Sequence, residues 1–437
     1  MNMSQHLSDI NPMALTVLFL AALISAVIAK VWLLQRQVHS VAFHRGEVPA
    51  QFAEKITLAS HQKAADYTLA KSKLVLIDIA IGAIFTVWLT LMGGLQIIHN
   101  LAIQSGLGNS LGQTWQPLAI QLLIFAVVML IGAAVDLPTS LWKQFVVDER
   151  FGFNRMTFKL FVIDTLKSTV LGIVIGLPLV ALVLWLMQSS GQLWWLWTFF
   201  VWMGFNLLVM LIFPTYIAPL FNKFTPLAEG DVKSRVESLL ARCGFASKGL
   251  FVMDGSKRSS HGNAYFTGMG KSKRIVFFDT LIERLSTNEI EAVLAHELGH
   301  FKHKHIVKRI VTVFALSFFA LALLGWLSSQ TWFYKGLGIT PEPTLWPAVA
   351  LILFMYVLPW FSFWFAPLSS ASSRKHEFEA DAYAAKQTDA HDLVSALVKL
   401  YQDNAATLTP DKWHSRFYDS HPPASERIAQ LKLQASS

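Results

Sequence analysis

Cysteine and charged residues are both scarce in this sequence. Cys243 is the only cysteine in 437 residues, so the chain forms neither an internal disulfide nor a zinc site made of several thiolates. Charged residues make up only 15% of the chain against 54% hydrophobic residues, and the mean hydropathy is +0.45. This composition argues against two or three ordinary soluble domains and indicates a membrane protein.

Internal repeats of fixed period and low-complexity linkers are also absent, so a transporter built from inverted repeats gains no support. Long apolar stretches are present instead, and each approaches the roughly 20 residues needed to cross a bilayer core. Several of them run for 18 or more residues with almost no charge, which is rare in soluble helices. The seven stretches lie near residues 13–34, 74–95, 117–135, 161–187, 193–213, 309–328 and 345–367. We therefore predict a mainly α, polytopic membrane protein with seven transmembrane helices.

The basic residues lie in alternate connecting segments. Residues 214–309 hold fifteen of the 36 Lys and Arg residues, residues 30–73, 136–160 and 368–437 hold most of the others, and residues 96–116 hold none. Because cytoplasmic loops of membrane proteins are enriched in Lys and Arg, this pattern predicts an N-terminus outside and basic segments and a C-terminus in the cytosol. The formal net charge of +8 then reflects topology and contact with anionic lipid headgroups, and no nucleic-acid partner is expected.

The order of apolar and polar segments predicts four parts. The N-terminal run MNMSQHLSDINPM lacks the basic start of a cleavable signal peptide, so the first span is expected to stay as a signal anchor. The four parts are a membrane region at 1–213, a cytosolic catalytic segment at 214–308, a transmembrane hairpin at 309–367 and a C-terminal catalytic segment at 368–437. Within the first catalytic segment, GLFVMDG, NAYFTGMG and KRIVFFDTLI place β-branched and aromatic residues between turns, which predicts a small sheet and hence an α+β catalytic portion.

The clearest chemical signal is HELGH at positions 296–300. Ser286 and Glu289 have the spacing of a capping box, and no proline follows, so one long helix is expected to begin there and run into the sixth span. His296 and His300 lie four residues apart, point to one side of that helix and can hold one Zn²⁺. Glu297 can accept the proton of a water molecule that attacks a peptide carbonyl. This is the metalloprotease interpretation of H-E-x-x-H, and the alternative is a chance match on a cytosolic helix.

A protease site of this kind needs a third protein ligand. The metzincin arrangement requires Gly and His at positions where this chain has His303 and Ile306, so a distant carboxylate is expected. The segment SSRKHEFEADAYAAKQ puts Glu377 and Asp381 on one helical face, as a ligand and a group that orients a ligand require. We predict one zinc ion per chain on both HELGH histidines and Glu377, with Asp381 orienting a ligand histidine or assisting proton transfer. A charged surface helix is the alternative.

The predicted hairpin supports this ligand set. Spans six and seven return to the same membrane face, so His300, nine residues before the hairpin, and Glu377, ten residues after it, come close together. His303 is expected to lie further from the site and to contact solvent or lipid headgroups. His305 and Glu379 are expected to face away.

Several longer motifs lie along the chain: VVDERFGFN from Val146, YIAPLFNKFTPL after the fifth span, NAYFTG from Asn263, HELGH, RKHEFEADAYA and SHPPASERI near the C-terminus. On these motifs the sequence resembles, over nearly its whole length, the integral-membrane type I CAAX prenyl endopeptidases. The resemblance implies seven helices around an intramembrane chamber, a zinc ion at its cytosolic end and the first glutamate of EFxAD as the third ligand.

The resemblance also implies roles for residues that composition alone leaves ambiguous. Asn263, Ala264 and Tyr265 are expected in an edge strand that pairs with the substrate by β-addition, although a turn is the alternative. His421 is expected near the zinc, where its imidazole can stabilise the oxyanion of a tetrahedral intermediate, whereas a lone His before two prolines is otherwise a loop residue. Arg427 is expected to pair with a carboxylate near the site or to cap a helix end.

Together these features predict an integral-membrane zinc metalloendopeptidase, resembling the type I CAAX prenyl proteases, that hydrolyses peptide or protein substrates, either prenylated or membrane-associated. Quality control of membrane proteins without prenyl specificity is one alternative, and the membrane is a bacterial inner membrane or the endoplasmic reticulum, depending on the organism. A metal-ion transporter is another alternative, but apart from Asp78, Asp164 and Lys167 the spans carry almost no charge. An inactive scaffold is disfavoured by the intact Glu297.

Overall fold

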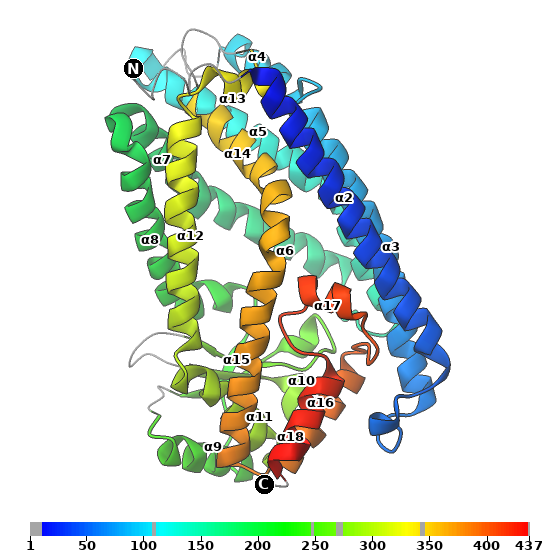
Figure 1. Ribbon diagram of the computed structural model, residues 1–437. Coiled ribbons are helices and arrows are strands. Elements are labelled where there is room, and N and C mark those ends of the chain that lie inside the picture. The colour runs from blue at the N-terminus through cyan, green and yellow to red at the C-terminus, as the bar shows by residue number, and fades with distance from the viewer. Residues whose placement is uncertain (1–10, 107–110, 246–248, 268–273, 341–345, 436–437) are drawn as a thin grey trace, which may run out of the picture.

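The structure is a computed structural model that describes residues 11–106, 111–245, 249–267, 274–340 and 346–435. Helices dominate it (Figure 1). The main helices are α2 (Pro12–Phe43), α3 (Leu58–Leu89), α4 (Gly94–Gln104), α5 (Gly112–Trp142), α6 (Phe158–Leu171), α7 (Leu177–Ser189), α8 (Trp194–Ile212), α9 (Asp231–Arg242), α10 (Asp279–Ile282), α11 (Thr287–Lys302), α12 (His305–Leu327), α13 (Thr331–Gly336), α14 (Pro347–Ser362), α15 (Ala366–Gln387), α16 (Ala390–Asp403), α17 (Lys412–Tyr418) and α18 (Ala424–Ala435). The first ten residues, which hold most of the predicted signal-anchor start, lie outside the described residues.

Seven helical segments of the described chain are long and apolar enough to cross a membrane, which confirms the predicted number. They are Pro12–Gly46, Leu58–Leu89, Gly112–Asp148, Phe158–Ser189, Gly191–Leu220, His305–Leu327 and Pro347–Gln387. The last of these runs for 41 residues, because α15 continues the helical path of α14 far beyond the apolar stretch. This extension carries the EFEAD sequence away from the apolar region. The chamber between the spans stays a prediction.

Two large apolar cores and a smaller cluster around Tyr67 and Phe153 hold the described part of the molecule together. The first joins α2, α3, α4, α5, α13 and α14 and buries side chains such as Phe19, Leu89 and Leu353 completely. The second joins α9, α11, α16, α18 and the sheet, with Leu239 and Phe277 at 0% exposure. In the second core, which lies outside the apolar spans, each fully buried side chain of this size contributes about 1.5–3 kcal/mol. Figure 1 shows the elements of the second core gathered at one end of the molecule, where α15 runs into them.

A four-stranded sheet lies in the second core, in the order β1-β2-β4-β3. Its strands are β1 (Phe224–Pro226), β2 (Leu250–Met253), β3 (Ala264–Thr267) and β4 (Arg274–Phe278). β2 and β4 are parallel, while β1 and β3 pair antiparallel to their neighbours. The predicted small sheet is confirmed, and β1, which the sequence did not reveal, ends in a proline at an outer position where a missing N–H is tolerated. β3 forms the other edge.

The predicted continuous helix from Ser286 into the sixth span is wrong. The capping box at Ser286 and Glu289 is present, but α11 ends at Lys302 and α12 begins at His305. Between them Lys304 has φ = 55°, a left-handed conformation that costs a non-glycine residue about 1–2 kcal/mol. This break in the helix places the buried His305 against His300 of α11.

Two carboxylates that the sequence places inside spans, Asp164 and Asp78, differ in whether they have a charged partner among the described residues. Asp164 on α6 accepts hydrogen bonds from Arg258, with Nε at 2.8 Å, so it joins α6 to the segment before β3. Asp78, in contrast, is exposed on α3.

Candidate metal centre

Three candidate ligand side chains form a triangle where α11 and α15 cross. The Nε2 atoms of His296 and His300 lie 3.3 Å apart, and they lie 3.5 and 3.4 Å from the two carboxylate oxygens of Glu377. In a tetrahedral zinc site with bonds of about 2.0–2.1 Å, the ligand atoms lie about 3.3 Å from one another. Glu377 Oε2 is buried and forms no hydrogen bond with any described residue, although Arg427 Nη1 lies 3.5 Å from it as an ion-pair partner. The spacing and the oxygen without a hydrogen bond both fit a metal ion among these three side chains.

Gly299 explains how the two helices approach so closely. A Cβ atom added at this position would lie 2.8 Å from the Cα and 3.0 Å from the carbonyl oxygen of Ala380. Ala380 is itself completely buried and offers only a methyl group to the contact. The glycine of HELGH therefore lets the backbone of α15 pack directly on α11, which places Glu377 opposite the two histidines.

Asp381 holds the first histidine ligand in one orientation. Its Oδ1 accepts a hydrogen bond from His296 Nδ1 at 2.7 Å, so that Nε2 keeps its lone pair for the metal. The carboxylate is fixed in turn by Arg427, whose Nε and Nη2 donate at 2.8 and 2.6 Å. Burial lowers the pKa of His296, but the carboxylates of Asp381 and Glu377 outweigh it and raise that pKa to about 9 in the metal-free protein. Of the two roles predicted for Arg427, pairing with a carboxylate or capping a helix end, the structure shows the first, and Arg427 is only 5% exposed.

His305 and Glu379 hold the second histidine, although both were expected to face away. Glu379 accepts a hydrogen bond from His305 Nε2 at 2.8 Å, and His305 Nδ1 lies 2.9 Å from His300 Nδ1. A neutral His305 that donates to the carboxylate must accept from His300, which leaves His300 Nε2 free for the metal. The expectation for His305 failed because it extended α11 as a regular helix past Lys304, and Glu379 on α15 is near the site only because His305 turns back to meet it. His303, in contrast, is exposed as expected.

Glu297 lies in the same cavity as the ligands but does not join them. It forms no hydrogen bond or ion pair with a described residue, and its burial raises the pKa of its carboxyl group. The charges of His296 and His300 oppose this rise. A carboxylate in such surroundings is suited to accept a proton and to release it again within one reaction cycle.

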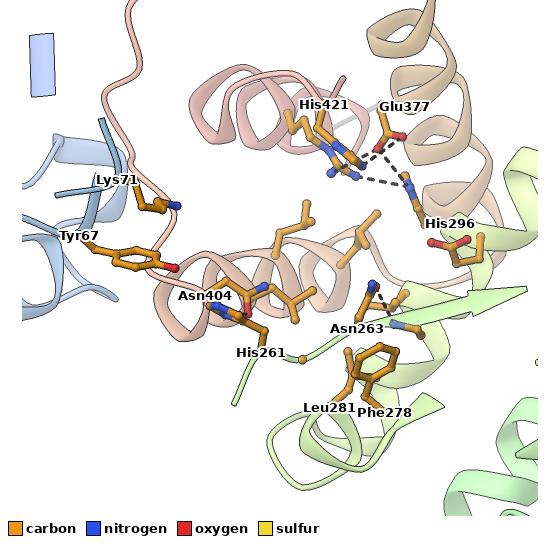
Figure 2. Close-up of a pocket in the computed structure, with 18 residues that line it drawn as sticks. Tyr67, Lys71, His261, Asn263, Phe278, Leu281, His296, Glu377, Asn404 and His421 are labelled. Carbon is orange, nitrogen blue, oxygen red and sulfur yellow. Dashed lines mark hydrogen bonds and ion pairs between the residues drawn. The ribbon is translucent and has the colours of Figure 1, made fainter. Parts of the chain in front are cut away.

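The cavity has a volume of about 500 Å³, within the usual range for ligand sites. Figure 2 shows Glu377, His296 and His421 together on one side of it. His421 Nε2 lies 3.6 Å from Glu377 Oε1, and the His421 side chain is 63% exposed. It is therefore at the site but open to whatever enters the cavity.

The three residues predicted to bind substrate differ in their placement. Asn263 and Ala264 line the cavity, whereas Tyr265 points to the opposite face of the sheet and lines a different, small pocket with Phe251. Phe278 N–H donates to the carbonyl of Asn263 at 2.9 Å, so the alternation of an antiparallel pair directs the N–H and C=O of Ala264 toward the open edge of β3. That N–H is bound by the side chain of Asn263 at 2.8 Å. The backbone of Ala264, rather than the ring of Tyr265, is the group available to a peptide.

These features define a class. The site has an HExxH helix, a carboxylate ligand from a second helix and an unpaired glutamate beside them, and the chain has seven helices long enough to span a membrane. Together these features are those of an integral-membrane metalloendopeptidase of the gluzincin type.

Comparison with known proteins gives the family. Residues 37–223 match the family model described as CAAX prenyl protease N-terminal, five membrane helices, and residues 226–435 match peptidase family M48.

Individual relatives agree. CAAX prenyl protease 1 homolog of Oryza sativa subsp. japonica is 39% identical over 314 residues, which is 71% of this chain and 73% of the relative. CAAX prenyl protease 1 of Saccharomyces cerevisiae is 40% identical over 313 residues, 68% of each chain. The crystal structure of S. mikatae Ste24p matches with a TM-score of 0.87 and 33% identity over 95% of this chain and 98% of the other. The chain belongs to peptidase family M48 and, within it, to the CAAX prenyl protease 1 group, which confirms the resemblance drawn from the motifs and does not favour a transporter.

Proposed function

We propose that this metalloendopeptidase binds one zinc ion through His296, His300 and Glu377 and cleaves CAAX-type substrates, in which a prenylated cysteine precedes three carboxyl-terminal residues. The observation that carries the metal assignment is the close approach of the three side chains: the two Nε2 atoms lie 3.3 Å apart, and each lies 3.4–3.5 Å from one oxygen of the buried Glu377 carboxylate. Two imidazoles and one carboxylate are one of the established ligand sets of catalytic zinc. The prenylated substrate is proposed from the relatives, whose names state it.

The residues around the ligands have distinct roles in this proposal. When bound, zinc supplies a Lewis acid that polarises a carbonyl group and lowers the pKa of water. Glu297 accepts the proton of the attacking water and passes it to the leaving amine. Asp381, held by Arg427, keeps His296 in the tautomer that binds the metal. His421 donates to the substrate oxygen as negative charge develops on it.

The substrate is proposed to pair with the open edge of β3 through the backbone of Ala264. Asn263 releases the Ala264 N–H when a peptide carbonyl takes its place. The basic segments that carry the site are proposed to face the cytosol, with the N-terminus outside, because of the distribution of Lys and Arg. The membrane itself is a bacterial inner membrane or the endoplasmic reticulum.

Cleavage of one peptide with and without a prenyl group on its cysteine tests the proposal in the purified protein, with Glu297→Gln as the inactive control. We expect cleavage of the prenylated peptide, with a kcat/KM at least about tenfold above that of the unmodified peptide, because burial of a prenyl chain adds apolar binding energy. Equal rates would instead indicate general proteolysis without prenyl specificity.

A further inference from the structure

The cavity at the metal ligands extends well beyond them. Its walls next to the ligands are apolar and come from α10, α11, α16 and the end of β4, with Leu281, Val293 and Leu397 among them. Its far end is polar and is formed by four side chains: Tyr67, Lys71, His261 and Asn404. Figure 2 places Lys71 and Tyr67 on the side of the cavity opposite to Glu377 and His296. A peptide bound across the metal would therefore pass apolar walls and then reach Lys71.

Lys71 brings a positive charge to this end of the cavity. It forms no hydrogen bond and no ion pair within 4.0 Å among the described residues, and its Nζ lies 4.1 Å from the ring centre of Tyr67. Asp148 attracts it electrostatically, but this carboxylate already accepts a hydrogen bond from Tyr67 at 2.8 Å and lies 3.8 Å from Lys143. Two ammonium groups thus face one carboxylate, and the hydrogen-bond donors of Lys71 are unused.

The other polar groups at this end are held rigidly. His261 Nδ1 lies 3.1 Å from Asn404 Oδ1, and the His261 ring stacks on Phe153 at 4.6 Å between centroids. Burial lowers the pKa of His261, so it remains neutral and does not compete with Lys71 for an anion. The end of the cavity is therefore a fixed frame around a single unpaired ammonium group.

The direction of β3 decides which end of a peptide reaches this frame. The cavity is lined by the residues that precede β3, His261, Gly262 and Asn263, and it continues from them to Lys71. A substrate that pairs antiparallel to β3 runs from the Thr267 end of the strand toward the Ala264 end. Its carboxyl-terminal residues then enter the part of the cavity that contains Lys71.

We propose that Lys71 binds the carboxyl-terminal carboxylate of the substrate, so that the protease selects a short apolar segment that ends in a free carboxyl group. The proposal rests on the proposed function, because CAAX-type cleavage occurs close to the chain end. An ammonium–carboxylate contact at the end of the cavity fixes how many residues lie between the metal and the carboxyl end of the substrate. Leu281, Val293 and Leu397 contact the apolar side chains of those residues.

The test compares one prenylated peptide as the free acid and as the carboxamide, in the detergent-purified full chain. For the wild-type protein we expect kcat/KM to be about 10- to 100-fold higher for the acid, the usual worth of a hydrogen bond to a charged group. In Lys71→Met this ratio should fall to about one, through loss of activity on the acid only. Lys73→Met is the matched control, since Lys73 is exposed on the same helix outside the cavity, and it should keep the wild-type ratio.

The outcomes separate the two proposals. Equal rates on acid and amide in the wild-type protein, or an unchanged ratio in Lys71→Met, would overturn the carboxylate subsite and leave the protease assignment intact. A purely structural role of Lys71 against Tyr67 would lower both rates together. If the wild-type protein cleaves neither peptide, the proposed substrate class fails, and binding of the apolar tripeptide acid and amide to Glu297→Gln still decides the subsite. Lys71→Arg, which keeps the charge, should retain most of the preference.

Discussion

Replacement of His305 by alanine tests whether the turn at Lys304 serves the metal centre. His305 links His300 Nδ1, at 2.9 Å, to the carboxylate of Glu379, at 2.8 Å. Its loss leaves His300 free to rotate and to bind a proton on either ring nitrogen. Removal of such a partner of a metal ligand typically costs 10–100-fold in metal affinity, so we expect the Kd for zinc to rise by about that factor.

The assay is a competition between the purified protein and a zinc chelator, read from the free chelator, with thermal unfolding measured in parallel to verify folding. Glu379→Gln keeps an oxygen that can accept from His305 and should show a smaller loss. His303→Ala is the matched control, because His303 is exposed and makes only ring contacts, with His305 at 5.5 Å and Tyr383 at 6.4 Å between centroids, and no hydrogen bond to a ligand among the described residues. A wild-type affinity in a folded His305→Ala protein would refute the inference that this histidine orients His300.

Two further predictions concern the same crossing of α11 and α15. Because the pKa of His296 is raised to about 9 and the metal requires the neutral ring, zinc binding at pH 7 should release about one proton and weaken by about tenfold per pH unit as the pH falls below 9. Calorimetric titration in buffers of different ionisation enthalpy measures this release, and a pH-independent affinity would contradict it. Gly299→Ala should destabilise the catalytic end by about 1–3 kcal/mol, since the added methyl group meets Ala380 at 2.8 Å, and a lower unfolding temperature with weaker zinc binding is the expected observation.

The sequence predicts the parts of the site that depend on local periodicity. His296 and His300 follow from the helical spacing of HELGH, and Glu377 follows from its position after an antiparallel hairpin. Seven spans and the strands around residues 250–278 are likewise visible as apolar runs and as β-branched segments between turns. These features depend on interactions between residues close in sequence, or on the bilayer thickness, which sets the length of a span.

Other features depend on contacts that no local pattern reveals. The left-handed Lys304 has no signal in its residue type, since glycine or asparagine is the usual occupant of that conformation. The contacts that His305 makes after this turn, with His300, Glu379 and the ring of His376, account for it. Lys71 lies on α3, more than 200 residues before the metal ligands, and appears in the sequence only as one of seven basic residues in a predicted cytosolic segment. Its place at the end of the cavity follows from the packing of α3 against α16.

The most direct test of the mechanism is the joint measurement of zinc content and peptide cleavage in Glu297→Gln. Glu297 lies beside the ligand triangle and pairs with no described residue, so the substitution should leave one zinc ion per chain. It should also reduce kcat by about 10²- to 10⁴-fold, the usual contribution of a general base. Cleavage at the wild-type rate with full zinc content would contradict the assigned role of Glu297, and loss of zinc would show that this carboxylate is a ligand.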